Sequence, residues 1–123
     1  MDRIEQTYSV LTVSAADKFS ASLHTLLPEG QYDPVRAVRD AASARRLLLE
    51  QSFDIVIVNA PLPDEFGTQL ALELSETSGA GVLLLVKAEQ YPELSARLTP
   101  NGILTLQKPT TPQLLTQTLH LLC

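Results

Sequence analysis

The stretch that decides the fold is Phe53-Asp54-Ile55-Val56-Ile57-Val58-Asn59. After the acid at position 54, four β-branched residues follow one another, so both faces of an extended segment are apolar. A strand that is apolar on both faces has to be covered on both, as in a parallel sheet packed between two layers of helices. We therefore predict a central strand over residues 53–59.

Four further apolar runs lie outward from this strand, at residues 8–13, 34–38, 82–86 and 103–106, and segments with helical spacing separate all five. Strands that alternate with helices predict an α/β fold, because parallel strands need a crossover between them and a helix supplies it. Right-handed crossovers place helices on both faces of the sheet. We expect residues 1–123 to form one doubly wound (βα)5 sandwich, without a linker or an internal repeat.

The ends of the helices are marked by short polar signals. Ser14 with Asp17 three residues later is typical of a capping box that opens the first helix. Asp40 is the predicted N-cap of the second helix, and Thr111 before Pro112 predicts the N-cap and first residue of the last. The third helix should end near residues 79–81, and a short fourth helix is predicted over residues 91–98, before a turn at residues 100–102. The predicted buried faces are Phe19, Leu23, Leu26 and Leu27; Ala44, Leu47 and Leu48; Leu70, Leu72 and Leu74; and Leu114, Leu115, Leu119 and Leu122.

Composition excludes several classes of function. With 45% hydrophobic and 19% charged residues the chain is typical of a globular protein, and its net charge of −5 repels nucleic acid and anionic lipid. We interpret the local group of arginines as a solvated helix face; its members are Arg36, Arg39, Arg45 and Arg46. His24 and His120 have no ligand-spaced neighbours, so we expect surface or packing roles for them and no metal binding or catalysis.

The predicted compartment is the cytoplasm. Cys123 is the sole cysteine and has no intramolecular partner, which favours a reducing environment. Residues 1–6 are polar, and no apolar run approaches the ~20 residues of a membrane span. We therefore expect neither secretion nor contact with a membrane.

In a doubly wound sheet the loops at the carboxyl ends of the strands converge, so a site is expected there. The residues that follow the strands at this edge are Ser14, Ala15, Ala16 and Asp17; Asn59, Ala60 and Pro61; Val86 and Lys87; and Lys108. No G-x-G-x-x-G, P-loop or G-x-S-x-G pattern occurs among them.

Two stretches resemble a known family, the receiver domain of bacterial two-component response regulators. One is Asp54-Ile-Val-Ile-Val-Asn59-Ala-Pro-Leu-Pro-Asp64-Glu-Phe-Gly67, and the other runs from Asn101-Gly102 to Lys108-Pro109. The resemblance covers nearly the whole chain. It implies a flavodoxin-like fold with the five parallel strands in the order 2-1-3-4-5, and a role in phosphorelay signal transduction.

The resemblance also implies that the family's chemistry is lost. The residue that accepts phosphate in the family is an aspartate, and here that position is Asn59, whose amide forms no acyl phosphate. The acidic pair that binds Mg²⁺ in the family matches Ser14 and Ala15, neither of which is acidic. We therefore expect no metal, no cofactor and no catalysis.

The family's relay positions are altered as well. Its switch hydroxyl falls on Val86 and its switch aromatic on Thr105, whereas Lys108 and the following Pro109 are retained. In receivers the peptide bond between those last two residues is usually cis, so the resemblance predicts a cis bond here.

Several of these residues also have a purely structural interpretation. Asn59 is also suited to capping its strand, and Lys108 to bonding loop carbonyls. Asp17 suits a capping box better than a metal site, and Asp64 suits a helix cap better than a substitute acceptor. Residual phosphorylation on Ser14 or Asp17 is a further alternative.

Two interpretations of the function remain, one as a protein-binding regulatory module and one as a ligand-binding or enzymatic domain. The first is a pseudo-receiver that binds a protein partner or an output domain, as in the N-terminal part of a transcription or antitermination regulator. The resemblance implies a homodimer through the fourth helix, fifth strand and fifth helix, with Tyr91, Leu94 and Leu98 and the exposed side of residues 112–123 at the surface. The second is a small ligand-binding or enzymatic domain, which requires a pocket with convergent polar groups at the carboxyl edge of the sheet.

Overall fold

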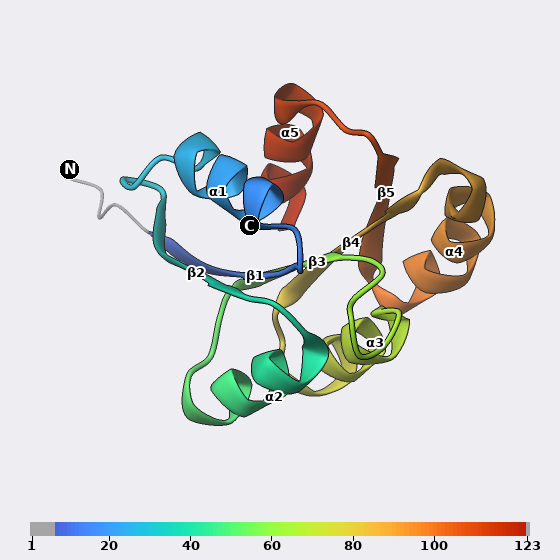
Figure 1. The fold of residues 1–123 in the computed structure, drawn as a ribbon, viewed down its shortest axis with the longest axis horizontal. Helices are drawn as coiled ribbons and strands as arrows, with labels where there is room; N and C mark the ends of the chain where they lie inside the picture. Colours follow the sequence, from blue (N-terminus) through green and yellow to red (C-terminus); the bar gives the residue numbers. More distant parts are fainter. Residues whose placement is uncertain (1–6, 123) are drawn as a thin grey trace.

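The computed structural model describes residues 7–122 and contains a five-stranded parallel sheet in the order β2-β1-β3-β4-β5 (Figure 1). The strands are β1 Tyr8–Val13, β2 Tyr32–Val38, β3 Ile55–Asn59, β4 Gly81–Lys87 and β5 Ile103–Lys108. The helices are α1 Asp17–Leu26, α2 Ala41–Glu50, α3 Thr68–Thr77, α4 Tyr91–Leu98 and α5 Pro112–Leu122. The predicted fold class, strand order and central strand are confirmed.

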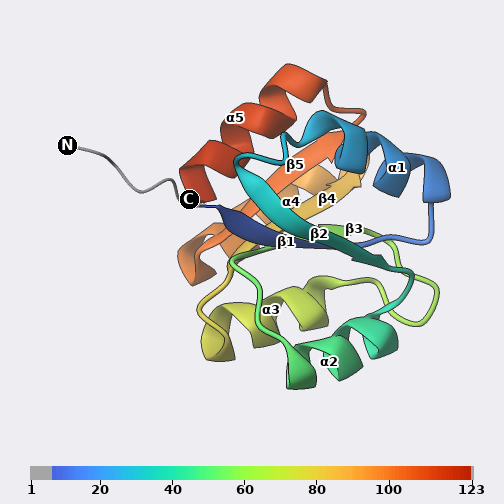
Figure 2. The ribbon, with the colours of Figure 1, turned by 90° about the vertical axis from the view of Figure 1, so that its left-hand side faces the viewer.

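The sheet separates two apolar cores, as the sequence of β3 requires. Helices α1 and α5 cover one face of the sheet, and α2 and α3 cover the other (Figure 2). Ile55 and Ile57 belong to the core with α1 and α5, while Val56 and Val58 belong to the core with α2, α3 and α4. All four of these side chains are fully buried. The β3 strand begins at Ile55, two residues later than predicted, and Asp54 just before it bonds Ser9 both through its backbone N–H and through its carboxylate.

Helix caps agree with the sequence at two of the three predicted places. The Asp40 carboxylate accepts the N–H of Ser43, and the Thr111 hydroxyl accepts the N–H of Leu114 at 3.1 Å. The capping box at Ser14 is wrong. α1 has Ala16 as its N-cap and no side-chain cap, because the Ser14 N–H still bonds the carbonyl of Val38 in the neighbouring strand and holds Ser14 in the sheet.

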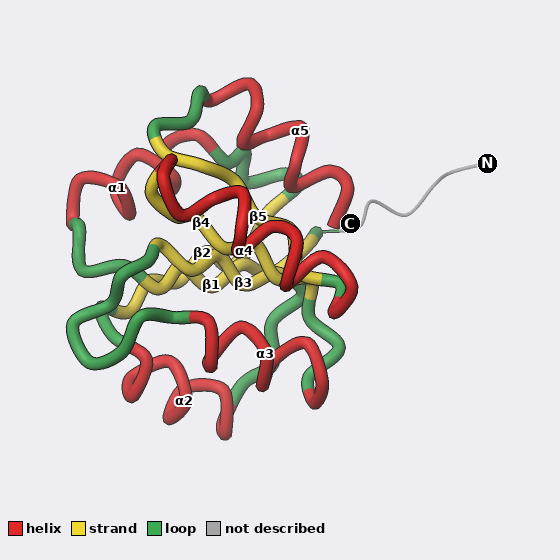
Figure 3. The backbone as a smooth tube through the Cα atoms, turned by 90° about the vertical axis from the view of Figure 1, so that its right-hand side faces the viewer, coloured by secondary structure: helices red, strands yellow, loops and turns green. Residues whose placement is uncertain are grey.

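The predicted faces of the last two helices need correction. Leu94 and Leu98 are buried because α4 packs that side against β5 (Figure 3) and into the core, so neither is available at the surface. Leu114 is 44% exposed, because the sheet-facing stripe of α5 consists of Leu115, Leu119 and Leu122, and Leu114 lies beside it.

Three predictions concern residues near the chain ends or the membrane. Within residues 7–122 no helix has the length and apolar character needed to cross a bilayer. The predictions made for residues 1–6 and for Cys123 lie outside the described residues.

Candidate functional site

A chain of hydrogen bonds joins three strand ends at the carboxyl edge of the sheet. The Lys108 ammonium at the end of β5 donates to the Asn59 Oδ1 atom at 2.8 Å and to the Ala60 carbonyl at 2.6 Å. The Asn59 Nδ2 group at the end of β3 donates in turn to the Ser14 hydroxyl oxygen at 3.0 Å. The edge therefore brings together the predicted positions after β1, β3 and β5, and we call them the Ser14–Asn59–Lys108 chain.

The polar atoms of this chain are largely occupied by one another. The Ser14 Oγ atom also accepts the N–H of Ala16 at 3.0 Å, and Ser14 is buried. Lysine only donates, so the amide oxygen of Asn59 faces Lys108 and its NH₂ group faces Ser14. Both structural alternatives foreseen for these residues are present, since Asn59 bonds neighbouring strands and Lys108 bonds a loop carbonyl.

The electrostatics of this edge are cationic. Lys87 and Lys108 are direct partners in the β4–β5 register, so two ammonium groups sit on adjacent strands. Burial, and secondarily the charge of Lys87, lower the pKa of Lys108. Among the described residues no group of three or more His, Cys, Asp or Glu side chains is arranged to hold a metal ion.

The residues at the position of the family's metal site do not fit Mg²⁺. That cation prefers carboxylate oxygens, whereas this place offers a buried hydroxyl, a methyl group and an amide oxygen that already accepts from an ammonium. Asp17, the acid next along the chain, is exposed and pairs with Arg39. We derive no chemical step through a metal ion here.

The two altered relay positions lie in the sheet beside this edge. Val86 is fully buried on β4, and Thr105 is 8% exposed on β5. The Thr105 hydroxyl is buried without a hydrogen-bond partner among the described residues. The Lys108–Pro109 peptide bond is cis, as the resemblance predicted.

A second set of polar contacts fixes the loop after β3, and sequence reasoning did not identify which helix Asp64 caps. The Asp64 carboxylate accepts the N–H groups of Ala41 and Ala42 at 3.0 and 2.9 Å, so it caps α2. These bonds lower the pKa of Asp64. The predicted cap is confirmed, but the helix lies 23 residues away along the chain, beyond any local capping pattern.

The interpretation of the arginines as a solvated face is wrong for Arg45. Its guanidinium pairs with Glu65 at 2.8 Å and with Glu73 at 2.9 Å, linking α2 to the loop after β3 and to α3. Glu65 also accepts the N–H of Leu70 at the start of α3. Arg45 lowers the pKa of Glu73. His24 and His120 are exposed, which fits the predicted surface role.

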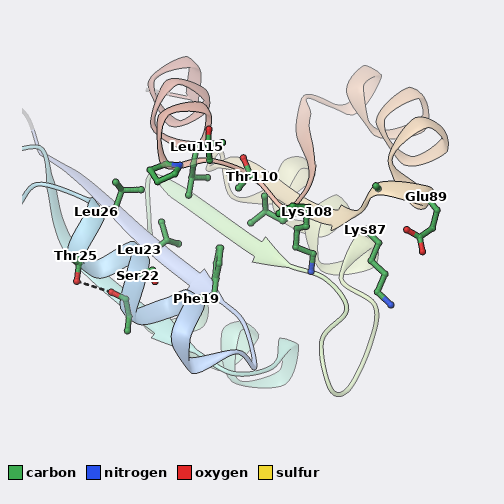
Figure 4. A pocket seen from close by; sticks show the side chains of 16 residues that line it. Phe19, Ser22, Leu23, Thr25, Leu26, Lys87, Glu89, Lys108, Thr110 and Leu115 are labelled. Carbon is green, nitrogen blue, oxygen red and sulfur yellow. Dashed lines mark hydrogen bonds between the residues drawn. The ribbon is translucent and has the colours of Figure 1, made fainter.

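A cavity of about 1000 Å³ opens beside the site, between α1 and the segment that joins β5 to α5 (Figure 4). Its lining includes the apolar side chains Phe19, Leu23, Leu26, Leu85 and Leu115, and also both lysines of the carboxyl edge. The alternative of a ligand-binding domain called for convergent polar groups, and the polar part of the lining consists of Lys87, Glu89 and Lys108 together with the hydroxyl side chains of Ser22, Thr25, Thr110 and Thr111.

Solved structures of other proteins share this fold. No protein-family model and no curated protein matches the chain by sequence. The structure is similar to the signal receiver domain of an HD domain-containing protein from Pseudomonas fluorescens Pf-5, with TM-score 0.83, 23% identity, and coverage of 99% of this chain and 90% of that one.

Two other solved structures agree. The signal receiver domain of a LuxO repressor protein from Vibrio parahaemolyticus gives TM-score 0.84 at 18% identity, covering 95% of this chain and 90% of that one. The chemotaxis response regulator CheY4 of Vibrio cholerae gives TM-score 0.81 at 22% identity, covering 96% and 100%. The chain therefore has the fold of the receiver domains of response regulators.

Proposed function

We propose that this chain is a regulatory module of receiver fold that acts through protein–protein contacts and is not phosphorylated on an aspartate. The observation that carries the proposal is the Ser14–Asn59–Lys108 chain. An amide occupies the acceptor position, and both of its polar atoms are engaged by neighbouring strand ends.

Phosphoryl transfer to a receiver needs a carboxylate nucleophile and a cation that offsets the charge of the phosphoryl group. Asn59 is neutral, and its oxygen already accepts from the Lys108 ammonium. Ser14 and Ala15 provide no anionic ligand for a metal ion. A partner that binds one conformation more tightly than another would shift such a module instead.

The test is incubation with acetyl phosphate and Mg²⁺, followed by intact mass spectrometry. The unsubstituted chain should gain no phosphoryl group. The triple variant Ser14→Asp, Ala15→Asp, Asn59→Asp restores three carboxylates at the edge and should gain one, whereas Asn59→Asp alone restores the acceptor without metal ligands and should react far less. An adduct on the unsubstituted chain contradicts the proposal, and peptide mapping would then show whether Ser14 or Asp17 carries it.

The surface proposed for self-association is the α4–β5–α5 face. Two large apolar side chains on α5, Leu114 and Leu121, are 44% and 77% exposed, and their spacing of two helical turns puts them on one side of the helix. Sedimentation velocity should show a dimer that Leu121→Lys weakens. The matched change Leu49→Lys, at a leucine on α2 that is 87% exposed, should leave it unchanged.

We further propose that the module works in the cytoplasm, without binding nucleic acid and without catalysis of its own. The net charge of −5 disfavours nucleic acid. At the carboxyl edge, the amine, amide and hydroxyl are bonded to one another, so no general base and nucleophile are paired there. An output domain or separate protein partner would carry the response.

A further inference from the structure

The cavity between α1 and α5 has the size and floor of a small-molecule site. Its volume of about 1000 Å³ is at the upper end of the range for ligand cavities. Leu23, Leu85 and Leu115 line it although they are only 1%, 0% and 5% exposed, so they form a recessed floor. An occupant has to enter the hollow to touch that floor, which favours a small molecule over a flat protein surface.

One end of the cavity is positively charged. Lys87 and Lys108 both line it, from neighbouring positions on adjacent strands (Figure 4). The Lys108 ammonium has three N–H donors, of which two bond Asn59 and Ala60. Glu89 also lines this end and offsets one of the two positive charges.

We propose that the cavity binds a small amphipathic monoanion, with an aromatic or aliphatic body over the leucine floor and a carboxylate or sulfonate beside Lys87 and Lys108. A single negative charge fits because one net positive charge remains at this end. The anion also relieves the repulsion between the two lysines. This proposal does not depend on whether the domain is phosphorylated.

The lining at the other end of the cavity indicates which way round the ligand binds. A shallower hollow continues along the same two helices and shares Leu26 and Pro112 with the main cavity. Its remaining lining is Gln113, Thr116, Gln117 and His120, and includes neither lysine nor arginine. The anionic end therefore belongs at the lysines and the body extends away from them.

The experiment compares two fluorescent probes of the same shape. The first is 8-anilinonaphthalene-1-sulfonate, and the second is N-phenyl-1-naphthylamine, which has the same aromatic body without the sulfonate. The sulfonate probe should bind saturably with one site per chain, about tenfold or more tighter than the neutral probe, as expected for a charge-assisted contact. Cooperative urea unfolding on the same sample confirms that the binding protein is folded.

Variants locate the binding. Lys108→Gln and Lys87→Gln should each weaken the sulfonate probe about tenfold and leave the neutral probe unchanged. Ser22→Trp places a large ring in the cavity from an exposed position on α1 and should abolish binding of both probes. His24→Trp, also exposed on α1 but outside the lining, is the matched control and should change neither affinity.

Each other outcome overturns the proposal. Equal affinity for the two probes would show an apolar hollow without selection for an anion. Binding that survives Ser22→Trp would place the probe elsewhere. A loss of sulfonate binding as the protein concentration rises would show that a second copy covers the cavity.

Discussion

Replacing Lys108 by methionine tests whether its ammonium holds the carboxyl edge together. Methionine keeps an apolar stem of similar length but removes the donors to the Ala60 carbonyl and the Asn59 amide oxygen. Ala60 is 1% exposed, so leaving its carbonyl without this donor costs about 1–3 kcal/mol. Asn59 is half-buried, and water can replace the lysine there, so we assign about 0.5–1 kcal/mol.

A compensating gain reduces this cost. Burial lowers the pKa of Lys108, which means that the folded protein disfavours the charged form that methionine eliminates. The net loss in the free energy of unfolding should be about 1–2 kcal/mol, equivalent to roughly 4–8 °C in Tm for a chain of this size. Lys87→Met removes the same charge from an exposed position at the end of the buried neighbouring strand and should change stability by less than about 0.5 kcal/mol.

Urea unfolding followed by far-ultraviolet circular dichroism measures these changes, since the chain has no tryptophan. A double-mutant cycle with Asn59→Ala isolates the contact between the two side chains and should give a coupling of about 1 kcal/mol. A Lys108→Met protein as stable as the unsubstituted chain, or a coupling of zero within error, would refute the view that this lysine bridges the strand ends.

Three further outcomes follow from burial and from the shifted pKa values. Leu119→Ala should cost about 2–5 kcal/mol in urea unfolding because Leu119 is fully buried, whereas Leu121→Ala at a 77% exposed position should cost less than about 0.5 kcal/mol. The N–H groups that donate to the Asp64 carboxylate lower its pKa in the folded protein. The stabilisation that Asp64 provides is therefore present above its usual pKa of 3.8 and is lost as pH falls through the lower folded value. Asp64→Asn should reduce this loss of Tm at acid pH, which a plot of Tm against pH measures. The pKa of Lys108 is also lowered, so the cost of burying its charge is present at neutral pH and is relieved as pH rises toward 10.5. Over this alkaline range, the Tm of the unsubstituted chain should therefore rise relative to that of Lys108→Met.

The fold was predictable because it depends on residue patterns that act locally. Four consecutive β-branched residues after Asp54 require a strand covered on both faces, and the structure gives it the central place in the sheet. Topology then brings the ends of β1, β3 and β5 to one edge. The meeting of Ser14, Asn59 and Lys108 was therefore foreseeable, although which atoms bond was not.

The failures share a physical cause, which is contact between segments distant in sequence. Ser14 matches a capping box locally, but its N–H is claimed by Val38 of the neighbouring strand. Arg45 lies in a group of arginines in the sequence, but in the structure it forms ion pairs with Glu65 and Glu73 of other segments. A single sequence contains no signal for either partner.

The neutral residues Ser14, Ala15 and Asn59 determine the net charge at the carboxyl edge of the sheet. Three carboxylates beside one lysine would leave a net negative charge that a cation has to offset, whereas Ser14, Ala15 and Asn59 leave the lysine charge in excess. The excess is tolerated because one amide oxygen and one carbonyl accept from the Lys108 ammonium, and because the Lys87 side chain is exposed. The ligand that we propose for such an edge is therefore an anion. The neutral residues that support the proposed loss of phosphorylation thus also leave the positive charge that the proposed anion site uses.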